Sequence, residues 1–329
     1  MKASRILKSV VIATTLAVQP VAWAQSASQD AEDYPRKPIR VIVPYTAGAI
    51  NDVLARRVGQ KLAEALKQPV IVENKPGGGA VIGTEYVAKA APDGYTLLQL
   101  SAAHSINPGL INDLPFDSIK DFSFITLAAT SSYVLIVAPA LPVKTVPELI
   151  ALAKSKPGQL SFSSTGNGGS AHMMGELLNS LAGISTLHIP YKGGAQATTD
   201  LVSNQVQFSF STYTGAQSFM KAGRVRAIAT TGAKRMSALP DLPTIGESVP
   251  GYDAAGWWGY AAPAGTPPAI VAKLNRELVK ILHTPEMRET FSAEGVEMLG
   301  TTPQEFQAHI QREMGVWGKL VKDAKITVN

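Results

Sequence analysis

The chain has 329 residues, of which 45% are hydrophobic and 17% charged, and this composition excludes a disordered, collagen-like or coiled-coil protein. It carries 30 basic and 25 acidic residues, but Lys2, Arg5 and Lys8 lie in an N-terminal segment that has the features of a removable signal. Without these three the balance is 30 − 3 = 27 basic against 25 acidic residues. A nearly neutral chain without a lysine and arginine run is not expected to bind nucleic acid.

The N-terminal segment is expected to be a secretory signal. Its basic start precedes an apolar run, Ser9 to Val18, and the small-residue triplet Ala22, Trp23, Ala24, which together predict cleavage after Ala24. A membrane anchor is the alternative, but the run is about half of the ~20 apolar residues that span a bilayer. Residues 25–33 are small and polar, and we expect them to form a flexible leader.

The chain contains no cysteine, and together with the predicted export this bears on its cellular location. With no cysteine, the chain is expected to form no disulfide, thiolate metal site, catalytic thiol or lipid-attachment site. The mature chain of 329 − 24 = 305 residues is long enough to be stable by packing alone. Export without disulfides is typical of a bacterial periplasm, and we predict that location.

Strands and helices alternate from the first ordered residues. The β-branched run Ile39–Val43 predicts a strand, and apolar residues at helical spacing predict a helix at Val53–Leu66. Strands at Val70–Val72 and Tyr95–Leu100 enclose a helix at Ile82–Ala90. Strands that alternate with helices predict a parallel sheet.

A second set of alternating elements follows a strand at Tyr133–Pro139 and begins with a helix at Glu148–Lys156. Prolines between these two elements indicate a domain boundary. The remaining elements of the second set are strands at Leu160–Ser163, Leu187–Ile189, Val206–Ser211 and Val225–Thr230, and helices at Ala171–Ala182, Ala195–Ser203 and Gly215–Ala222.

The chain is then expected to return to the first domain through a strand at Trp257–Pro263. Trp257 and Trp258 fall on opposite faces of that strand, so one can pack inward while the other lines a cleft. Two crossings predict a first lobe of residues 34–135 plus 259–329 and a second lobe of residues 136–258. Helices at Ala269–Leu282, Pro285–Glu294 and Pro303–Ala324 complete the first lobe.

Two loops are candidate ligand contacts, because ligands of parallel sheets bind beyond the carboxyl ends of strands. Pro44–Asp52 (PYTAGAIND) joins a strand to a helix in the first lobe, and Phe162–His172 (FSSTGNGGSAH) does so in the second. Free amides at a helix start favour an anion. The alternative is purely structural: Asn51 or Asp52 caps one helix, and Ser170 caps the other after a tight turn.

Nucleotide, hydrolase and zinc chemistry are disfavoured. Neither the second-lobe loop nor Pro76–Gly83 (PGGGAVIG) matches a phosphate-binding or dinucleotide motif. Ser170 and His172 approach the nucleophile elbow of a serine hydrolase, but residues two apart on a helix do not face each other. The five histidines lack metal-ligand spacing, and we expect no cofactor and no metal. An exported serine esterase stays as an alternative.

An ordered set of motifs carries a resemblance to a known family. It comprises YPRKPIRVIVPYTAG from Tyr34, VIVENKPGGG at 70–79, PDGYTLL at 92–98, FSSTGNGGSAH, IPYKGGAQA at 189–197, AGRVRAIATT from Ala222, LPDLPTIGE at 239–247 and APAGTPP at 262–268. In this set the chain resembles the receptors of the tripartite tricarboxylate transporter family, also called Bug-type periplasmic solute-binding proteins. The resemblance covers Tyr34 to the C-terminus.

The resemblance implies a type II periplasmic binding protein, or Venus flytrap, with two α/β lobes that each contain a mostly parallel sheet flanked by helices. It implies a monomeric receptor that closes on a small organic carboxylate and delivers it to a membrane permease without catalysis. A ligand-sensing subunit for a signalling kinase is an alternative use of the same cleft. The expected ligand contacts are Tyr45, Thr46, Ala47, Gly48, Ala49, Asn51, Asp52 and Ser101 in lobe 1, and Ser163, Ser164, Thr165, Asn167, Gly168, Ser170, His172, Thr212 and Tyr213 in lobe 2.

Departures from the family pattern bear on the ligand. Ala49 stands where relatives usually have a second glycine, and the bulky Ile50 lies beside it, so amide access or the shape of the cleft is expected to differ. Gln207 and Thr212 stand where relatives often carry aspartates. The loss of acidic residues disfavours amino-bearing ligands and favours plain carboxylates or dicarboxylates, including aromatic ones that stack on Tyr213.

Overall fold

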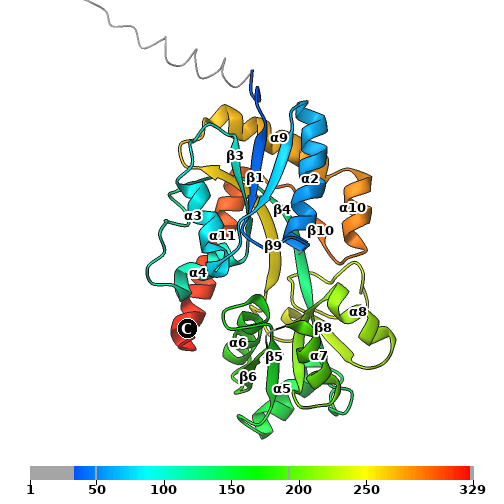
Figure 1. Ribbon diagram of the computed structural model, residues 1–329. Helices are drawn as coiled ribbons and strands as arrows, with labels where there is room; N and C mark the ends of the chain where they lie inside the picture. The colour runs from blue at the N-terminus through cyan, green and yellow to red at the C-terminus, as the bar shows by residue number, and fades with distance from the viewer. Residues whose placement is uncertain (1–32, 49, 192, 327–329) are drawn as a thin grey trace, which may run out of the picture.

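The computed structural model describes residues 33–48, 50–191 and 193–326 (Figure 1). The predicted signal, its cleavage after Ala24, nearly all of the leader and Ala49 therefore lie outside the described residues. In the described part of the chain, no helix is long and apolar enough to cross a membrane.

Lobe 1 is built on a six-stranded arrangement in the order β2-β1-β3-β9-β4-β10. Its strands β1, β2 and β3 are mutually parallel neighbours, whereas β9 runs antiparallel to both β3 and β4. The strands are β1 (Ile39–Val43), β2 (Val70–Asn74), β3 (Thr96–Ser101), β4 (Phe122–Val137), β9 (Ala255–Pro263) and β10 (Glu297–Met298), and the helices are α2 (Ile50–Leu66), α3 (Val81–Ala88), α4 (Ala103–Leu110), α9 (Pro268–Leu282), α10 (Pro285–Ser292) and α11 (Pro303–Asp323), with a single 3₁₀ turn η1 (Gly78–Ala80).

Lobe 2 uses the other end of β4. There β4 lies between β7 and β8 and is antiparallel to both, while β5 is parallel to β6 and β7. The elements are β5 (Ser161–Ser164), β6 (Leu187–Pro190), β7 (Phe208–Thr212), β8 (Arg226–Thr230), α5 (Val146–Ser155), α6 (Ser170–Ala182), α7 (Gly194–Val202), α8 (Tyr213–Lys221) and the 3₁₀ turn η2 (Ile245–Glu247).

Strand β4 connects the two lobes without a break. Residues 122–132 of β4 pair with β9 in lobe 1, and residues 133–137 pair with β7 in lobe 2. Figure 1 shows β4 and β9 running along the junction between the lobes. In lobe 1 the strands β9 and β10 run opposite to the parallel set, and in lobe 2 β4 does so. Strands β4 and β9 are thus the two predicted crossings. The lobe boundaries at residues 135 and 258 stay a prediction.

Three elements were missed or shortened by the sequence patterns. The first half of β4, FSFITLAATSS, contains small and hydroxyl residues in place of an uninterrupted apolar run. Helix α4 spans only eight residues and contains Pro108, a residue that normally ends a helix. Strand β10 has only two residues. All other predicted strands and helices are confirmed, with ends shifted by a few residues.

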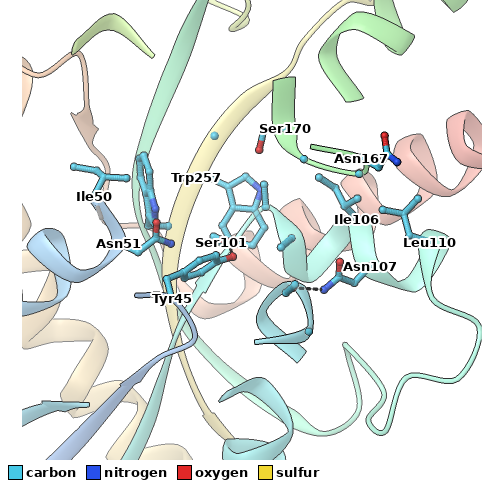
Figure 2. Close-up of a pocket in the computed structure, with 18 of the residues that line it drawn as sticks. Tyr45, Ile50, Asn51, Ser101, Ile106, Asn107, Leu110, Asn167, Ser170 and Trp257 are labelled. Carbon is cyan, nitrogen blue, oxygen red and sulfur yellow. Dashed lines mark hydrogen bonds between the residues drawn. The ribbon is translucent and has the colours of Figure 1, made fainter. Parts of the chain in front are cut away.

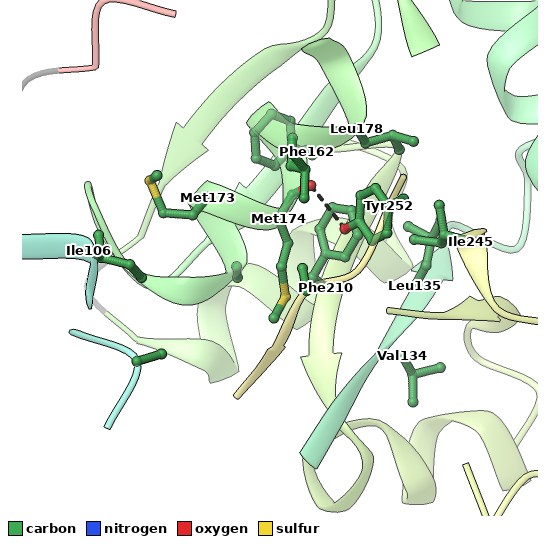
Figure 3. Close-up of a cluster of buried hydrophobic side chains, with 14 of the residues drawn as sticks. Ile106, Val134, Leu135, Phe162, Met173, Met174, Leu178, Phe210, Ile245 and Tyr252 are labelled. Carbon is green, nitrogen blue, oxygen red and sulfur yellow. Dashed lines mark hydrogen bonds between the residues drawn. The ribbon is translucent and has the colours of Figure 1, made fainter. Parts of the chain in front are cut away.

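Two hydrophobic clusters fill the molecule. One covers the α2, α9 and α10 side of the lobe 1 sheet and includes Trp258. The other lies on the opposite side of that sheet, includes Trp257, and continues into lobe 2. Figure 3 shows its lobe 2 part, in which Tyr252 donates a hydrogen bond of 3.0 Å to the carbonyl of Met174. The prediction that the two tryptophans occupy opposite faces of β9 is confirmed.

The close packing around β9 generates a stability prediction. A Cβ atom on Gly259 would lie 2.2 Å from Cζ of Phe306 and 2.8 Å from the carbonyl oxygen of Thr126. We expect Gly259→Ala to lower the free energy of unfolding by about 2 kcal/mol, because β9 and α11 must separate to admit the methyl group. Urea denaturation monitored by circular dichroism measures the change.

Gly315→Ala in α11 is the matched control, because no atom lies within 4 Å of its added Cβ. In an exposed helical position this change is expected to be neutral or stabilising by up to ~1 kcal/mol. Equal stability of the Gly259→Ala variant and the wild type would contradict the packing described for β9.

Candidate ligand-binding site

A cavity of about 540 Å³ lies between the lobes (Figure 2). Its wall is formed by the β1–α2 connection, the end of β3, helix α4, the glycine loop before α6 and the crossing strands β4 and β9. None of the described residues that line it carries a charged side chain. A ligand of this cavity must therefore be recognised by hydrogen bonds, peptide dipoles and apolar contact.

The lobe 1 wall presents hydroxyl and amide groups. Tyr45, from the β1–α2 connection, shares a hydrogen bond between its hydroxyl and that of Ser101 at the end of β3. Burial raises the pKa of Tyr45, and the bond with Ser101 opposes this rise. The backbone oxygen of Asn51 accepts a 2.8 Å hydrogen bond from the side chain of Gln99, which fixes the start of α2 against β3. The Asn51 side chain remains at the cavity.

The lobe 2 wall is the N-terminus of α6. Its N-cap residue, Gly169, provides no side-chain cap. Gly166 and Gly168 have φ angles of 135° and 72°, which side-chain-bearing residues rarely adopt, and this backbone brings Asn167 and Gly168 to the cavity. Ser170 forms a hydrogen bond with Tyr133, whose pKa is raised by burial. No protein side chain therefore occupies the position where α6 offers its free amides.

These two walls are suited to an anion. The first amides of a helix have no intrahelical acceptor and carry the positive end of the helix dipole. An uncapped helix start beside hydroxyl groups binds a carboxylate without any cationic side chain. Of the predicted contacts, the structure brings six together around this cavity: Tyr45, Asn51, Ser101, Asn167, Gly168 and Ser170.

Asp52 is engaged within lobe 1 and does not line the cavity. Its carboxylate accepts hydrogen bonds from the amide of Gly48 at 3.0 Å and from Asn74 at 2.9 Å, and Arg56 lies 2.9 Å away. Burial alone would raise the pKa of Asp52, but the bonds from Arg56, Gly48 and Asn74 together hold it below its ordinary value. The Gly48 amide is thereby occupied. Thr46 and Ala47 are exposed beside it and lie outside the cavity lining.

Ser163, Ser164 and His172 lie behind the glycine loop. Ser164 shares a 2.6 Å hydrogen bond with Nε2 of His188, and it also accepts from the amide of Gly166 at 3.1 Å. His172 accepts at Nδ1 from the amide of Gly168 at 3.0 Å, and its ring stacks on His188 with centroids 3.7 Å apart. These hydrogen bonds and the stacked rings thus fix the conformation of the glycine loop before α6. Ser163 is fully buried, and its hydroxyl has no hydrogen-bond partner among the described residues.

The other predicted lobe 2 contacts are farther from the cavity. Thr165 is exposed on the loop. Thr212 caps α8 by accepting a 3.2 Å hydrogen bond from the amide of Gly215. Tyr213 is buried, and a Cβ on Gly295 would lie 2.8 Å from its Cβ, so this tyrosine packs against lobe 1. Thr165, Thr212 and Tyr213 are not among the lining residues.

Several residues that line the cavity were not predicted from the sequence. Gly78 and Gly79 belong to Pro76–Gly83, a glycine-rich segment that matches no nucleotide-binding motif and for which the sequence predicted no ligand contact. Helix α4 contributes Ile106, Asn107 and Leu110, which no pattern had placed there. Tyr133, Gly256, Trp257 and Trp258 come from the crossing strands, and of these only the tryptophan pair carried a signal in the sequence.

The described side chains show no hydrolase or metal arrangement around the cavity. Ser170 pairs with Tyr133, whereas His172 and His188 bond to Gly168 and Ser164. No group of three or more histidine, aspartate or glutamate side chains within residues 33–326, as far as they are described, is placed to hold a metal ion.

Comparison with known proteins assigns the family. A sequence model described as the tripartite tricarboxylate transporter family receptor matches residues 54–326. Protein BugT of Bordetella pertussis is 33% identical over 301 residues, which cover 91% of this chain and 92% of BugT.

Three solved structures share the architecture. An R. palustris protein with adipate superposes with a TM-score of 0.76 at 32% identity, covering 90% of this chain and 99% of that one. The periplasmic binding protein BugD gives 0.72 at 34% identity, covering 89% and 99%. MatC of Rhodopseudomonas palustris with bound malate gives 0.72 at 29% identity, covering 88% and 100%.

The fold and the cavity between its lobes define a periplasmic-type solute-binding protein with two α/β lobes. More specifically, the chain belongs to the tripartite tricarboxylate transporter receptor family, which is the resemblance that its motifs carried. The predicted fold class is thereby confirmed.

The stacked histidines generate a pH prediction. Burial lowers the pKa of both His172 and His188 to about 4, and for His188 the neighbouring His172 lowers it further. Both rings are therefore neutral in the folded state, while the unfolded chain takes up protons near pH 6.5. The stability that depends on neutral rings is complete above pH 6.5 and is lost as the pH falls toward 4. The carboxylate of Glu176 lies 3.8 Å from Nε2 of His172.

We expect the wild type to lose on the order of 1 kcal/mol more stability between pH 7 and pH 5 than His188→Asn does, because the variant has one fewer ring to protonate. Urea denaturation at the two pH values measures the difference. The same loss in both proteins would argue against a buried neutral pair.

Proposed function

We propose that this chain is the periplasmic solute-binding receptor of a tripartite tricarboxylate-type transporter and that it captures a small organic carboxylate, either a dicarboxylate or an aromatic carboxylate. The observation that carries the proposal is the uncharged cavity, in which the uncapped start of α6 faces the Tyr45 and Ser101 hydroxyls. Family membership supports the receptor role, and the adipate and malate bound by two relatives support the carboxylate.

In this proposal the carboxylate lies between the glycine loop and the lobe 1 wall. Asn167 and Ser170 receive it from lobe 2, next to Gly168, whose amide donates to His172, and Tyr45, Asn51 and Ser101 receive it from lobe 1. The lobes, with boundaries near residues 135 and 258, close around the ligand by a hinge motion of the crossing strands. The receptor acts as an exported monomer without catalysis, and the closed form delivers the ligand to integral-membrane permease subunits.

Removing polar groups from the lobe 2 wall tests the site. We expect Ser170→Ala and Asn167→Ala each to weaken carboxylate binding by roughly fivefold to tenfold, because each removes a hydrogen bond to a charged group, worth about 1–1.5 kcal/mol. Isothermal titration calorimetry with a panel of carboxylates measures the dissociation constants.

Ser180→Ala is the matched control, since Ser180 is exposed near the other end of the same helix. It is expected to leave affinity unchanged. Unaltered binding by both cavity variants would place the ligand elsewhere.

A further inference from the structure

Helix α4 gives the cavity an apolar end. Ile106, Leu110 and Ile111 line the cavity at this helix, together with Ala102 and Ala103 at its start. Leu110 and Ile111 are only half-buried, so they present hydrocarbon surface to the cavity. Figure 2 shows Ile106 and Leu110 on the opposite side of Trp257 from Tyr45 and Asn51. Asn167 of the glycine loop lies on the same side as Ile106 and Leu110, so the α4 surface is adjacent to the glycine loop and separate from the polar groups of lobe 1.

Trp257 extends this apolar surface because its only hydrogen-bond donor is turned away. Its indole N–H donates a 2.6 Å hydrogen bond to the Glu313 carboxylate on α11. The same oxygen accepts from the hydroxyl of Ser105 on α4 at 2.7 Å. Glu313 thus ties β9 and α4 to α11. The Trp257 ring is only 1% exposed and packs edge-on against Phe306 and His309, so it contributes a small apolar part of the cavity wall.

Asn107, the polar lining residue of α4, is already engaged within lobe 1. Asn107 donates its amide N–H to the carbonyl of Gly79 at 2.8 Å, as Figure 2 shows. No described cation lines the cavity. The Glu313 carboxyl behind Trp257 is buried, and burial raises its pKa. A second carboxylate placed here would find no cationic side chain among the described lining residues.

We propose that the α4 surface and Trp257 form a specificity subsite that selects monocarboxylates with an apolar alkyl or aryl body over dicarboxylates. This inference rests on the proposed function, because it takes the carboxylate to be held at the glycine loop and the Ser101 hydroxyl. The body of the ligand then lies along the Trp257 ring and ends against Ile106, Leu110 and Ile111. Of the ligands considered under the proposed function, this subsite favours an aromatic monocarboxylate over a dicarboxylate.

Matched ligand pairs test the subsite. Hexanoate and adipate have the same chain length and differ in one terminal carboxylate, and benzoate and terephthalate differ in the same way. Titration calorimetry on the purified protein is expected to show at least tenfold tighter binding of the monocarboxylate in both pairs. Lengthening the alkyl chain from butyrate to hexanoate is expected to strengthen binding by about fourfold per methylene, because each methylene becomes buried.

A charge placed on the α4 surface should reverse the preference. In Leu110→Lys, and independently in Ile111→Lys, adipate is expected to bind more tightly than hexanoate, because the ammonium group supplies the missing partner. Both positions are half-exposed, and circular dichroism checks that each variant folds. Leu181→Lys, on the exposed surface of α6 and outside the cavity, is the control and is expected to keep the wild-type preference.

The outcomes separate the two proposals. If wild-type protein binds adipate and terephthalate as tightly as their monocarboxylate partners, or if neither lysine variant changes the ratio, the apolar subsite is wrong while the receptor function stands. If none of the four carboxylates binds, the proposed function itself is overturned.

Discussion

Strand β4 is the constraint on which the rest of the structure depends. It is hydrogen-bonded to β9 through residues 122–132 and to β7 and β8 through its last residues, so it belongs to both lobes at once. Backbone ladders on both sides leave β4 little freedom to shift its register. The positions of the two ligand loops relative to each other therefore follow from one strand. The hydrophobic cluster that passes from lobe 1 into lobe 2 reinforces this link.

The cavity proposed to bind a carboxylate has no charged side chain among its described lining residues. Two nearby carboxyl groups are engaged within the protein: Asp52 holds the β1–α2 connection, and Glu313 accepts hydrogen bonds from Trp257 and Ser105 behind the wall. The free amides at the start of α6 then supply the positive potential. A receptor that must release its ligand to a transporter benefits from such an arrangement, because peptide dipoles hold an anion less tightly than a buried cation does.

The sequence predicted the secondary structure well where the apolar pattern is local. Strands β1, β5 and β9 and helices α2, α6 and α9 were all expected near their observed positions. The glycine loop before α6 was expected to contact a ligand, because glycines and hydroxyl residues at a helix start favour an anion, and this loop lines the cavity. Helix α4 was not predicted, because it has only eight residues and contains Pro108, which together obscure the helical spacing of its apolar residues. The part of the cavity wall that α4 forms was therefore not predicted either.

The sequence alone determined the alternation of strands and helices, the family, and the two loops that follow parallel strands, because these depend on residues close together in the chain. Tertiary structure decided which side chains of those loops reach the cavity. Asp52 is engaged by Asn74, Ser164 by His188, and the Trp257 indole by Glu313, and these partners are separated by between 22 and 56 residues. How much hydrogen-bonding capacity a polar side chain keeps for a ligand depends on its distant partners, and packing in three dimensions decides which partners those are.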